Sequence, residues 1–185
     1  MDEAGRGPLA GPVVAGAVVL HRHDFRVALD DSKRLTPLAR ERAYEAILRS
    51  AHIGVGAVGP EEIDRIGIQA ATHRAMQLAI RRLGILPELV LVDGLHLPPG
   101  CGPAMKAVVR GDSRSLAIAC ASIVAKVTRD RWMRWVHRLH PEYGFARHKG
   151  YGTAQHMEAL EAFGPGPFHR YTFHPVSGSP GSGVL

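Results

Sequence analysis

Residues 2–20 of this 185-residue chain read DEAGRGPLAGPVVAGAVVL and are the most informative part of it for the architecture. The second half, residues 12–20, is short, apolar and rich in β-branched residues, which is typical of a buried strand. The first half places two acids, Asp2 and Glu3, before a Gly5-Arg6-Gly7 turn. The stretch therefore predicts a buried strand that is preceded by a charged turn.

Strands and helices are expected to follow in a mixed order. Apolar runs predict strands at residues 53–58, 89–92 and 105–109, and helical periodicity predicts helices at 37–50, 60–66, 68–83, 113–140 and 153–163. Thr36 before Pro37 is a helix start, and Gly67 separates the second helix from the third. The inward faces are predicted to be Leu38, Ala43, Ile47 and Leu48 in the first helix and Leu116, Ala119, Ile123, Val127 and Trp135 in the long one.

This mixture predicts one α/β domain with a mixed sheet over residues 1–176. The Gly/Ser/Pro-rich residues 177–185 are expected to form a flexible tail. Two cysteines make no disulfide framework, and Cys120 lies in an apolar stretch where we expect it to be buried. We find no apolar stretch long enough to cross a bilayer and no signal peptide, so we expect a cytoplasmic protein.

The charge balance is basic. Lys and Arg number 23 against 17 acids, which gives a net charge of +6. A basic domain favours polyanionic partners, above all nucleic acid, although solvated basic helix faces explain the charge equally well.

Four acids lie where predicted strands meet their flanking turns. Asp2 and Glu3 precede the Gly-Arg-Gly turn, Asp93 follows the run 89–92, and Asp112 comes shortly after the run 105–109. Sites in open α/β sheets form at strand ends, so these carboxylates can converge, although any one of them alone is read more simply as a surface acid. Clustered carboxylates repel each other and suit Mg²⁺ or Mn²⁺, and two such ions can promote phosphodiester hydrolysis.

An ordered series of motifs resembles the type 2 ribonuclease H (ribonuclease HII) family. The series spans residues 2 to about 176 and consists of residues 2–13 (DEAGRGPLAGPV), 31–35 (DSKRL), 92–94 (VDG), 111–112 (GD), 121–130 (ASIVAKVTRD), 148–153 (HKGYGT) and 169–173 (HRYTF). One such element is a weak signal, whereas the complete set in this order is very specific.

The resemblance implies an RNase H-like α/β fold, with a central mixed sheet flanked by helices and a C-terminal helical extension. It implies an endoribonuclease that hydrolyses the RNA strand of RNA/DNA hybrids and nicks duplex DNA 5′ of embedded ribonucleotides, leaving 3′-hydroxyl and 5′-phosphate ends. Two Mg²⁺ or Mn²⁺ ions would be held by the metal ligands Asp2, Glu3, Asp93 and Asp112. A replication clamp is a partner that the family admits, and we expect a monomer.

The same resemblance assigns the substrate contacts. Gly5, Arg6 and Gly7 would sense the 2′-hydroxyl through backbone groups, which glycine allows to approach closely. Tyr151 would pack on the sugar that follows the ribonucleotide. Phosphates would be held by Lys33, Ser122, Lys126 and Arg129, whereas Asp130 is expected to be a structural partner. For each of these residues an ordinary structural or solvated role is the alternative.

The sequence departs from the family pattern at one place. A hydrophobic half-strand normally precedes the Asp-Glu pair, whereas here Met1 comes directly before Asp2. We therefore expect Asp2 and Glu3 to hang from a frayed end, so either the true start lies upstream or this form binds metal poorly.

Three other functions deserve comparison. Residues 54–59 match G-x-G-x-x-G, but residues 65–87 contain no acid for a ribose, so a dinucleotide site is rejected. A non-catalytic nucleic-acid-binding module remains open, and metal-dependent cutting would exclude it. Another RNase H-like nucleotidyl transferase, such as a resolvase or integrase core, would be excluded by cutting only at ribonucleotides.

Overall fold

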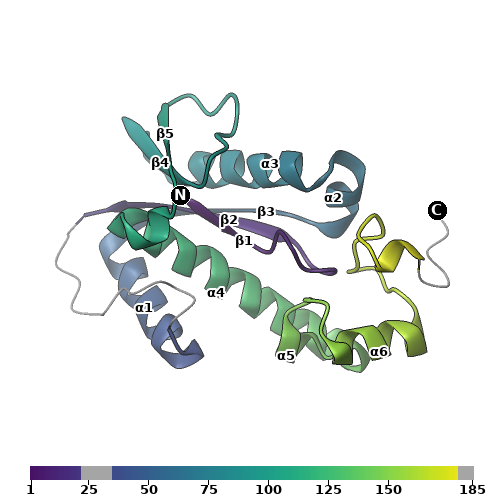
Figure 1. Cartoon of the computed structure of the whole chain (residues 1–185). Coiled ribbons are helices and arrows are strands. Elements are labelled where there is room, and N and C mark those ends of the chain that lie inside the picture. Colours follow the sequence, from purple (N-terminus) through teal and green to yellow (C-terminus); the bar gives the residue numbers. More distant parts are fainter. Residues whose placement is uncertain (22–34, 179–185) are drawn as a thin grey trace.

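The computed structural model describes residues 1–21 and 35–178 (Figure 1). Lys33 and most of the motif at 31–35 lie outside the described residues. The strands are β1 (Asp2–Ala4), β2 (Val13–Leu20), β3 (Ala51–Val58), β4 (Leu89–Asp93) and β5 (Ala104–Val108). The helices are α1 (Pro37–Ser50), α2 (Pro60–Ile66), α3 (Ile68–Arg81), α4 (Leu116–Leu139), α5 (Phe145–His148) and α6 (Ala154–Phe163), with short 3₁₀ helices η1 (Gly111–Ser113), η2 (Pro141–Tyr143) and η3 (Val176–Gly178).

The strands form two ladders. Strands β1, β2 and β3 pair antiparallel in that order, and β4 pairs with β5 in parallel. Met1 joins the two ladders, because its amino group donates to the Leu91 carbonyl at 2.7 Å and its carbonyl accepts from the Asp93 N–H at 3.0 Å. This is the hydrogen-bond pattern of parallel strands, so the mixed sheet that was predicted is present.

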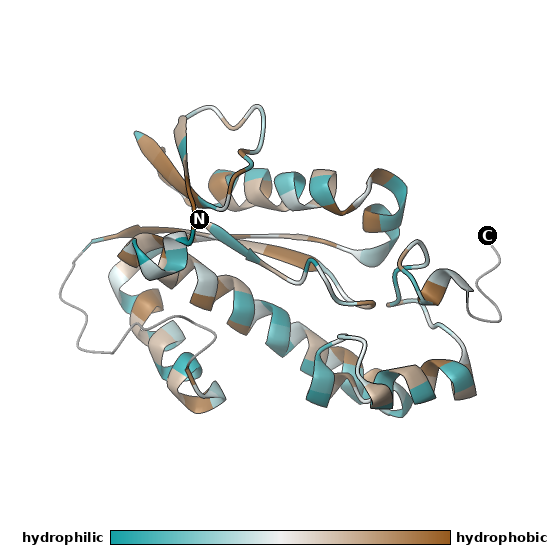
Figure 2. Ribbon diagram, viewed as in Figure 1, coloured by the Kyte–Doolittle hydropathy of each residue, from teal (hydrophilic) through white to brown (hydrophobic). Residues whose placement is uncertain are grey.

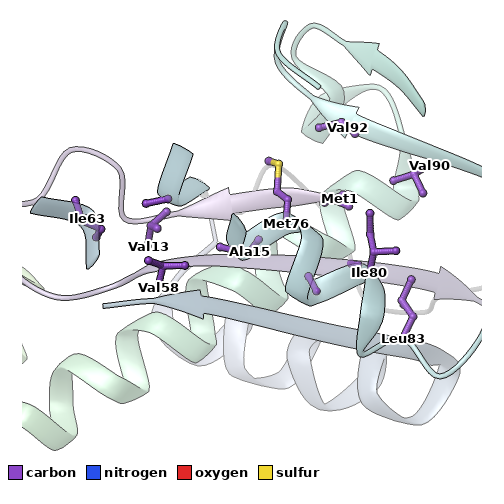
Figure 3. Packing of buried hydrophobic residues seen from close by; sticks show 14 residues of the cluster. Met1, Val13, Ala15, Val58, Ile63, Met76, Ile80, Leu83, Val90 and Val92 are labelled. Atoms are coloured by element: carbon purple, nitrogen blue, oxygen red, sulfur yellow. The ribbon is translucent and has the colours of Figure 1, made fainter. Parts of the chain in front are cut away.

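The expected fraying at Asp2 and Glu3 is wrong. Asp2 pairs with Gly16 and Glu3 pairs with Ala15 in the β1–β2 ladder. Met1 is only 3% exposed. Its side chain packs in one apolar cluster with Val90 and Val92 of β4 and with Met76 and Ile80 of α3 (Figure 3). Burial of these side chains, each worth ~1.5–3 kcal/mol, holds the start of β1 in place.

Glycines on the sheet allow helices to pack closely against both of its faces. Helices α2 and α3 cover one face, and α4 with α1 covers the other (Figure 1). A Cβ atom on Gly54 or Gly56 would collide with a backbone carbonyl of α3, and one on Gly16 would lie 2.6 Å from the Ala121 carbonyl oxygen of α4. The G-x-G-x-x-G match at 54–59 therefore has a packing explanation.

Helix faces agree with the prediction only in part. Ala43 and Ile47 of α1 are buried, whereas Leu38 is 62% and Leu48 is 50% exposed, so their inward placement was wrong. Helix α1 packs mainly on α4, a single cylinder, and buries a narrow stripe. Trp135 was also placed wrongly and is 45% exposed, because it lies on α4 beyond the sheet. In Figure 2 both α1 and α4 carry hydrophilic and hydrophobic residues along their lengths.

The C-terminal part folds back onto the loop after β1. Thr153 caps α6, with its hydroxyl accepting from the His156 N–H, as predicted. An isolated bridge pairs Ala10 with His169. Residues 177 and 178, predicted to begin a flexible tail, belong to η3, and residues 179–185 lie outside the described residues. Within the described chain, no helix is both long and apolar enough to cross a membrane.

Candidate active site

Three of the four predicted carboxylates converge at the junction of β1 and β4. Asp2 and Glu3 lie on β1 and Asp93 ends β4, next to the backbone of Met1. Asp93 is close enough to both Asp2 and Glu3 for its charge to raise the pKa of each. Asp112 lies in η1, which approaches this junction through a hydrogen bond from the Gly111 N–H to Asp93 Oδ1 at 2.6 Å.

The carboxylates are not assembled as a coordination shell. Over residues 1–21 and 35–178, no three His, Cys, Asp or Glu side chains are placed to hold one metal ion together. The Asp112 Oδ1 atom accepts from the Ser113 N–H within its own turn at 2.9 Å. For these side chains to hold one metal ion together, they would have to move.

Burial and mutual repulsion nonetheless disfavour the charged forms of Asp2 and Glu3. Burial, followed by the charge of Glu3, raises the pKa of Asp2 to about 7, although a hydrogen bond with Ser122 opposes this. Burial also raises the pKa of Glu3, and the nearby Arg6 opposes that rise. Crowded, desolvated carboxylates are destabilised when ionised, and a hard divalent cation relieves that cost. The donor set thus fits Mg²⁺ or Mn²⁺ chemically.

The Gly5-Arg6-Gly7 turn is held by one buried arginine, Arg170, and packs against another, Arg129. Arg170 is fully buried and donates to the carbonyls of Gly5 at 2.5 Å, Arg6 at 2.8 Å and Gly11 at 2.8 Å. Gly5 has a φ of +92°, and a Cβ there would collide with the side chain of Arg129. The turn therefore requires glycine at this position and is fixed in shape.

Arg170 was not among the predicted site residues. The motif at 169–173 was the signal for it, but nothing local shows that the side chain turns inward. Its three acceptors are carbonyls about 160 positions away in the sequence, so only the folded chain reveals the contact.

Arg129 also lies inside, which argues against the phosphate contact predicted for it. Its side chain is 1% exposed, and its guanidinium donates to the carbonyls of Pro12, Ala10 and Lys149 at 2.9, 3.0 and 2.9 Å. Each of the three guanidinium nitrogens thus already donates to a carbonyl. Arg129 instead ties α4 to the loop after β1 and to the segment before Tyr151.

Other predicted substrate residues meet in one cleft beside the acids. The cleft has a volume of about 160 Å³, and Glu3, Gly5, Ser122, Lys126 and Tyr151 are among its lining residues. Tyr151 is 46% exposed there. Arg40, which the sequence analysis did not single out, lines the same cleft. Charge alone was its only sequence signal.

The ammonium group of Lys126 is held in place by Asp130. The Lys126 Nζ atom donates to Asp130 Oδ1 at 2.7 Å, one helical turn further along α4. Asp130 also lies 4.0 Å from Arg40. The expectation that Asp130 is a structural partner agrees with these contacts.

A smaller hollow lies on the other side of Glu3. Glu3, Arg6 and Asp93 line it together with Gln69, His73 and His96, and its volume is about 60 Å³. Arg6 donates to Glu3 Oε1 at 3.4 Å and to Gln69 Oε1 at 2.7 Å. Glu3 thus lines both hollows, and the sequence analysis did not identify the residues of α3 that line this one.

Comparison with known proteins agrees with this geometry. The profile of the family described as Ribonuclease HII matches residues 1–176. Ribonuclease HII from Chlamydia trachomatis serovar A is 52% identical over 186 residues, covering 100% of this chain and 85% of that protein.

Two solved structures resemble the fold. Ribonuclease HII of Archaeoglobus fulgidus, solved in a complex with PCNA, has a TM-score of 0.80 at 26% identity and covers 93% of this chain and 92% of its own. Ribonuclease H2 from Pyrococcus horikoshii has a TM-score of 0.78 at 28% identity, with coverages of 96% and 93%. A full-length profile match, high identity and a shared RNase H-like fold lead to one conclusion: this chain belongs to the ribonuclease HII family of endoribonucleases.

Proposed function

We propose that this endoribonuclease cuts the RNA strand of RNA/DNA hybrids, and duplex DNA on the 5′ side of an embedded ribonucleotide, through the acids at the β1–β4 junction. The observation that carries the proposal is the cleft that Glu3 shares with Gly5 and Tyr151. A reactive acid, a backbone turn that can approach a sugar and an exposed aromatic ring lie side by side there. A plain binding module has no need of this combination.

Asp2, Glu3, Asp93 and Asp112 would hold the divalent ions, Mg²⁺ or Mn²⁺. Such ions, when bound, supply an activated water and charge stabilisation at the leaving oxygen. The side chains of the protein supply the negative field that retains them. The raised pKa of Asp2, caused mainly by burial and the charge of Glu3, supports this assignment because a cation would relieve that repulsion.

The turn at residues 5–7 would recognise the 2′-hydroxyl. Its carbonyls at Gly5 and Arg6 are fixed by Arg170. At Gly7 no atom lies within 4 Å of the position that a Cβ would take, so the backbone is open to an approaching sugar. A rigid, open backbone suits recognition of one hydroxyl, the group that distinguishes RNA from DNA.

Tyr151 and Lys126 would orient the strand. The half-exposed Tyr151 ring would pack against the sugar that follows the ribonucleotide, and Lys126, held by Asp130, would face a phosphate. Ser122, which is buried and hydrogen-bonded to Asp2, would contact a phosphate next to the acids. Lys33 is kept as a further phosphate contact on sequence grounds alone.

A replication clamp is the protein partner that we propose for this chain. The relative from Archaeoglobus fulgidus was solved with PCNA, which supports a replication clamp as a partner here. We propose a cytoplasmic monomer with residues 1–176 as one catalytic domain. Cys101 and Cys120, which are both free thiols, accord with a reducing compartment.

The test uses a labelled DNA duplex that carries one ribonucleotide, with an all-DNA duplex as control. We expect a nick 5′ of the ribonucleotide with Mg²⁺ or Mn²⁺, none with chelator, and none in the control. Binding without metal-dependent cutting would instead establish a binding module. Cutting of the all-DNA control would indicate a general nucleotidyl transferase.

A pair of variants then tests the aromatic contact. Tyr151→Ala should lower cutting at a single ribonucleotide about 10-fold, a loss of ~1.4 kcal/mol, because the contact of the ring with the sugar is lost. Tyr151→Phe keeps the ring and should retain most activity. If Tyr151→Ala cuts as well as the parent chain, the ring does not contact the substrate and serves only to pack against the protein.

A further inference from the structure

Behind Tyr151 lies a pair of buried histidines that the proposed reaction does not use. His156, on α6, is fully buried, and His169 is 1% exposed. Their Nε2 atoms are 3.0 Å apart. The other ring nitrogen of His156, Nδ1, lies 2.9 Å from the backbone carbonyl oxygen of Tyr151.

The hydrogen bonds of this pair run in one direction. The Gly166 N–H donates to His169 Nδ1 at 2.9 Å, so that nitrogen is an acceptor, and the longer approach of the Gly166 carbonyl at 3.2 Å is secondary. A neutral His169 then carries its proton on Nε2 and donates to His156 Nε2. His156 consequently carries its proton on Nδ1 and donates to the Tyr151 carbonyl. The relay therefore ends on the residue that lines the cleft.

We propose that His169 and His156 are positioning residues that hold Tyr151 against the nucleic acid, and so set the preference for a single ribonucleotide in duplex DNA. This inference rests on the proposed role of Tyr151. It extends that role to two residues that contact neither the acids nor the cleft.

The backbone around Tyr151 shows why such support matters. Lys149 and Gly150 both have positive φ values, 54° and 85°, so the chain turns sharply just before the ring. The Tyr151 N–H donates to the His148 carbonyl at 3.0 Å, and the Tyr151 carbonyl also accepts from the Thr153 N–H at 2.9 Å. The ring itself lies 6.0 Å from the Arg129 guanidinium, and the hydrogen bonds to its backbone fix where the chain presents it.

Surrounding groups keep both histidines neutral. Burial lowers the pKa of His156 and of His169 to about 4, and neighbouring histidines add to the effect. Phe145 lies 5.5 Å from each ring, and His148 stacks on His156 at 4.5 Å. A proton added to His169 Nδ1 would face the Gly166 N–H and remove the acceptor of that hydrogen bond.

The experiment compares kcat/KM for a single-ribonucleotide duplex with kcat/KM for a long RNA/DNA hybrid. His156→Phe keeps an aromatic ring and removes the donor to Tyr151, and we expect the ratio to fall about 5-fold. His156→Asn places an amide donor near the position of Nδ1 and should recover most of the ratio. In a Tyr151→Ala background, His156→Phe should change the ratio no further.

A matched control lies in the same aromatic cluster. Tyr143→Phe removes the 2.9 Å bond to the Gly164 carbonyl and should leave the ratio unchanged. An equal fall in Tyr143→Phe would overturn the inference, since general loosening would then explain it. If Tyr151→Ala lowers the ratio but His156→Phe does not, the inference about the histidines is overturned and the proposed role of Tyr151 stands. If Tyr151→Ala leaves the ratio unchanged, the proposed role of Tyr151 fails as well.

A second measurement needs no variant. Nitrogen-15 NMR of the intact chain at neutral pH should show His156 protonated at Nδ1 and His169 protonated at Nε2. The opposite tautomers, or a charged ring, would overturn the relay even if the His156 variants failed to fold.

Discussion

The Asp93 carboxylate accepts a 2.6 Å hydrogen bond from the backbone N–H of Gly111. This bond joins the end of β4 to η1 and carries Asp112 toward the other acids. Gly111 is buried, and a Cβ there would meet the side chain of Ile118. The position of Asp112 thus depends on Gly111, whose small size lets η1 approach both β4 and α4.

Replacement of Asp93 by Asn should abolish cutting. Asparagine keeps an oxygen that can accept from Gly111, so the fold should persist, while the loss of a charged ligand should lower the rate 100-fold or more, about 3 kcal/mol. The nicking assay measures the rate, and fluorescence polarisation should show duplex binding largely intact. Asp64→Asn is the matched control, because Asp64 caps residues 171 and 172 away from the acids. Full activity of Asp93→Asn would remove Asp93 from the metal site.

Arg129→Met should destabilise the protein. The substitution leaves three carbonyls without a donor, two of them bonded to Arg129 through fully buried contacts, which should cost about 2–4 kcal/mol in the free energy of unfolding. Urea denaturation measures this. Arg131→Met, which breaks an exposed pair with Glu41, should cost less than about 1 kcal/mol. A stable Arg129→Met chain with weakened duplex binding would restore the phosphate contact that the sequence suggested.

Lys126→Ala should weaken binding of every duplex to a similar degree. A lysine that faces a phosphate contributes without reading sequence, so its loss should reduce the slope of log K against log salt by about 1. Titrations in chelator at several salt concentrations measure that slope. Arg65→Ala removes the same charge from α2, where Arg65 pairs with Glu62, and should leave the slope nearly unchanged. Identical slopes for both variants would show that only overall charge matters.

Stability should fall in acid because of the buried histidines. The pKa of His156 and of His169 is lowered from 6.5 to about 4 in the folded chain, mainly by burial, so the unfolded chain binds more protons between these values. The stability they contribute is therefore complete above about pH 6.5 and is lost progressively toward pH 4. His148, His140 and Tyr143 surround them, and the lowered pKa of His148 acts in the same direction. The total effect should be on the order of 1–3 kcal/mol per histidine.

The opposite trend of Asp2 must be separated from this effect. Its pKa is raised from 3.8 to about 7, mainly by burial, so without metal its contribution becomes more favourable as pH falls through that range. The difference in unfolding free energy between the parent chain and His156→Asn, measured without metal from pH 7 to pH 4, isolates the histidine. A difference that does not change with pH would contradict the assignment.

Local patterns predicted most of the elements. The apolar run before Leu20 became β2, and the Thr36 and Thr153 caps mark the starts of α1 and α6, because hydrogen bonding at a helix start depends on residues three positions apart. The three acids at β1 and β4 were also found, since strand ends can be read from the adjoining apolar runs. The direction in which a side chain faces was harder to predict. Trp135 and Leu48 fit the apolar stripe of their helices yet are exposed, because the width of the buried stripe depends on which elements pack against the helix.

The order of motifs in the chain was enough to identify the family and to predict the acidic site, because both depend on which residues occur and how they are spaced. The three-dimensional packing alone determined which basic groups meet solvent. Lys126 and Arg129 are three positions apart on α4, yet one lines the cleft and the other lies buried on the carbonyls of Ala10 and Pro12. Those carbonyls are more than 110 positions away in the sequence, so only the folded chain brings them within reach of the guanidinium.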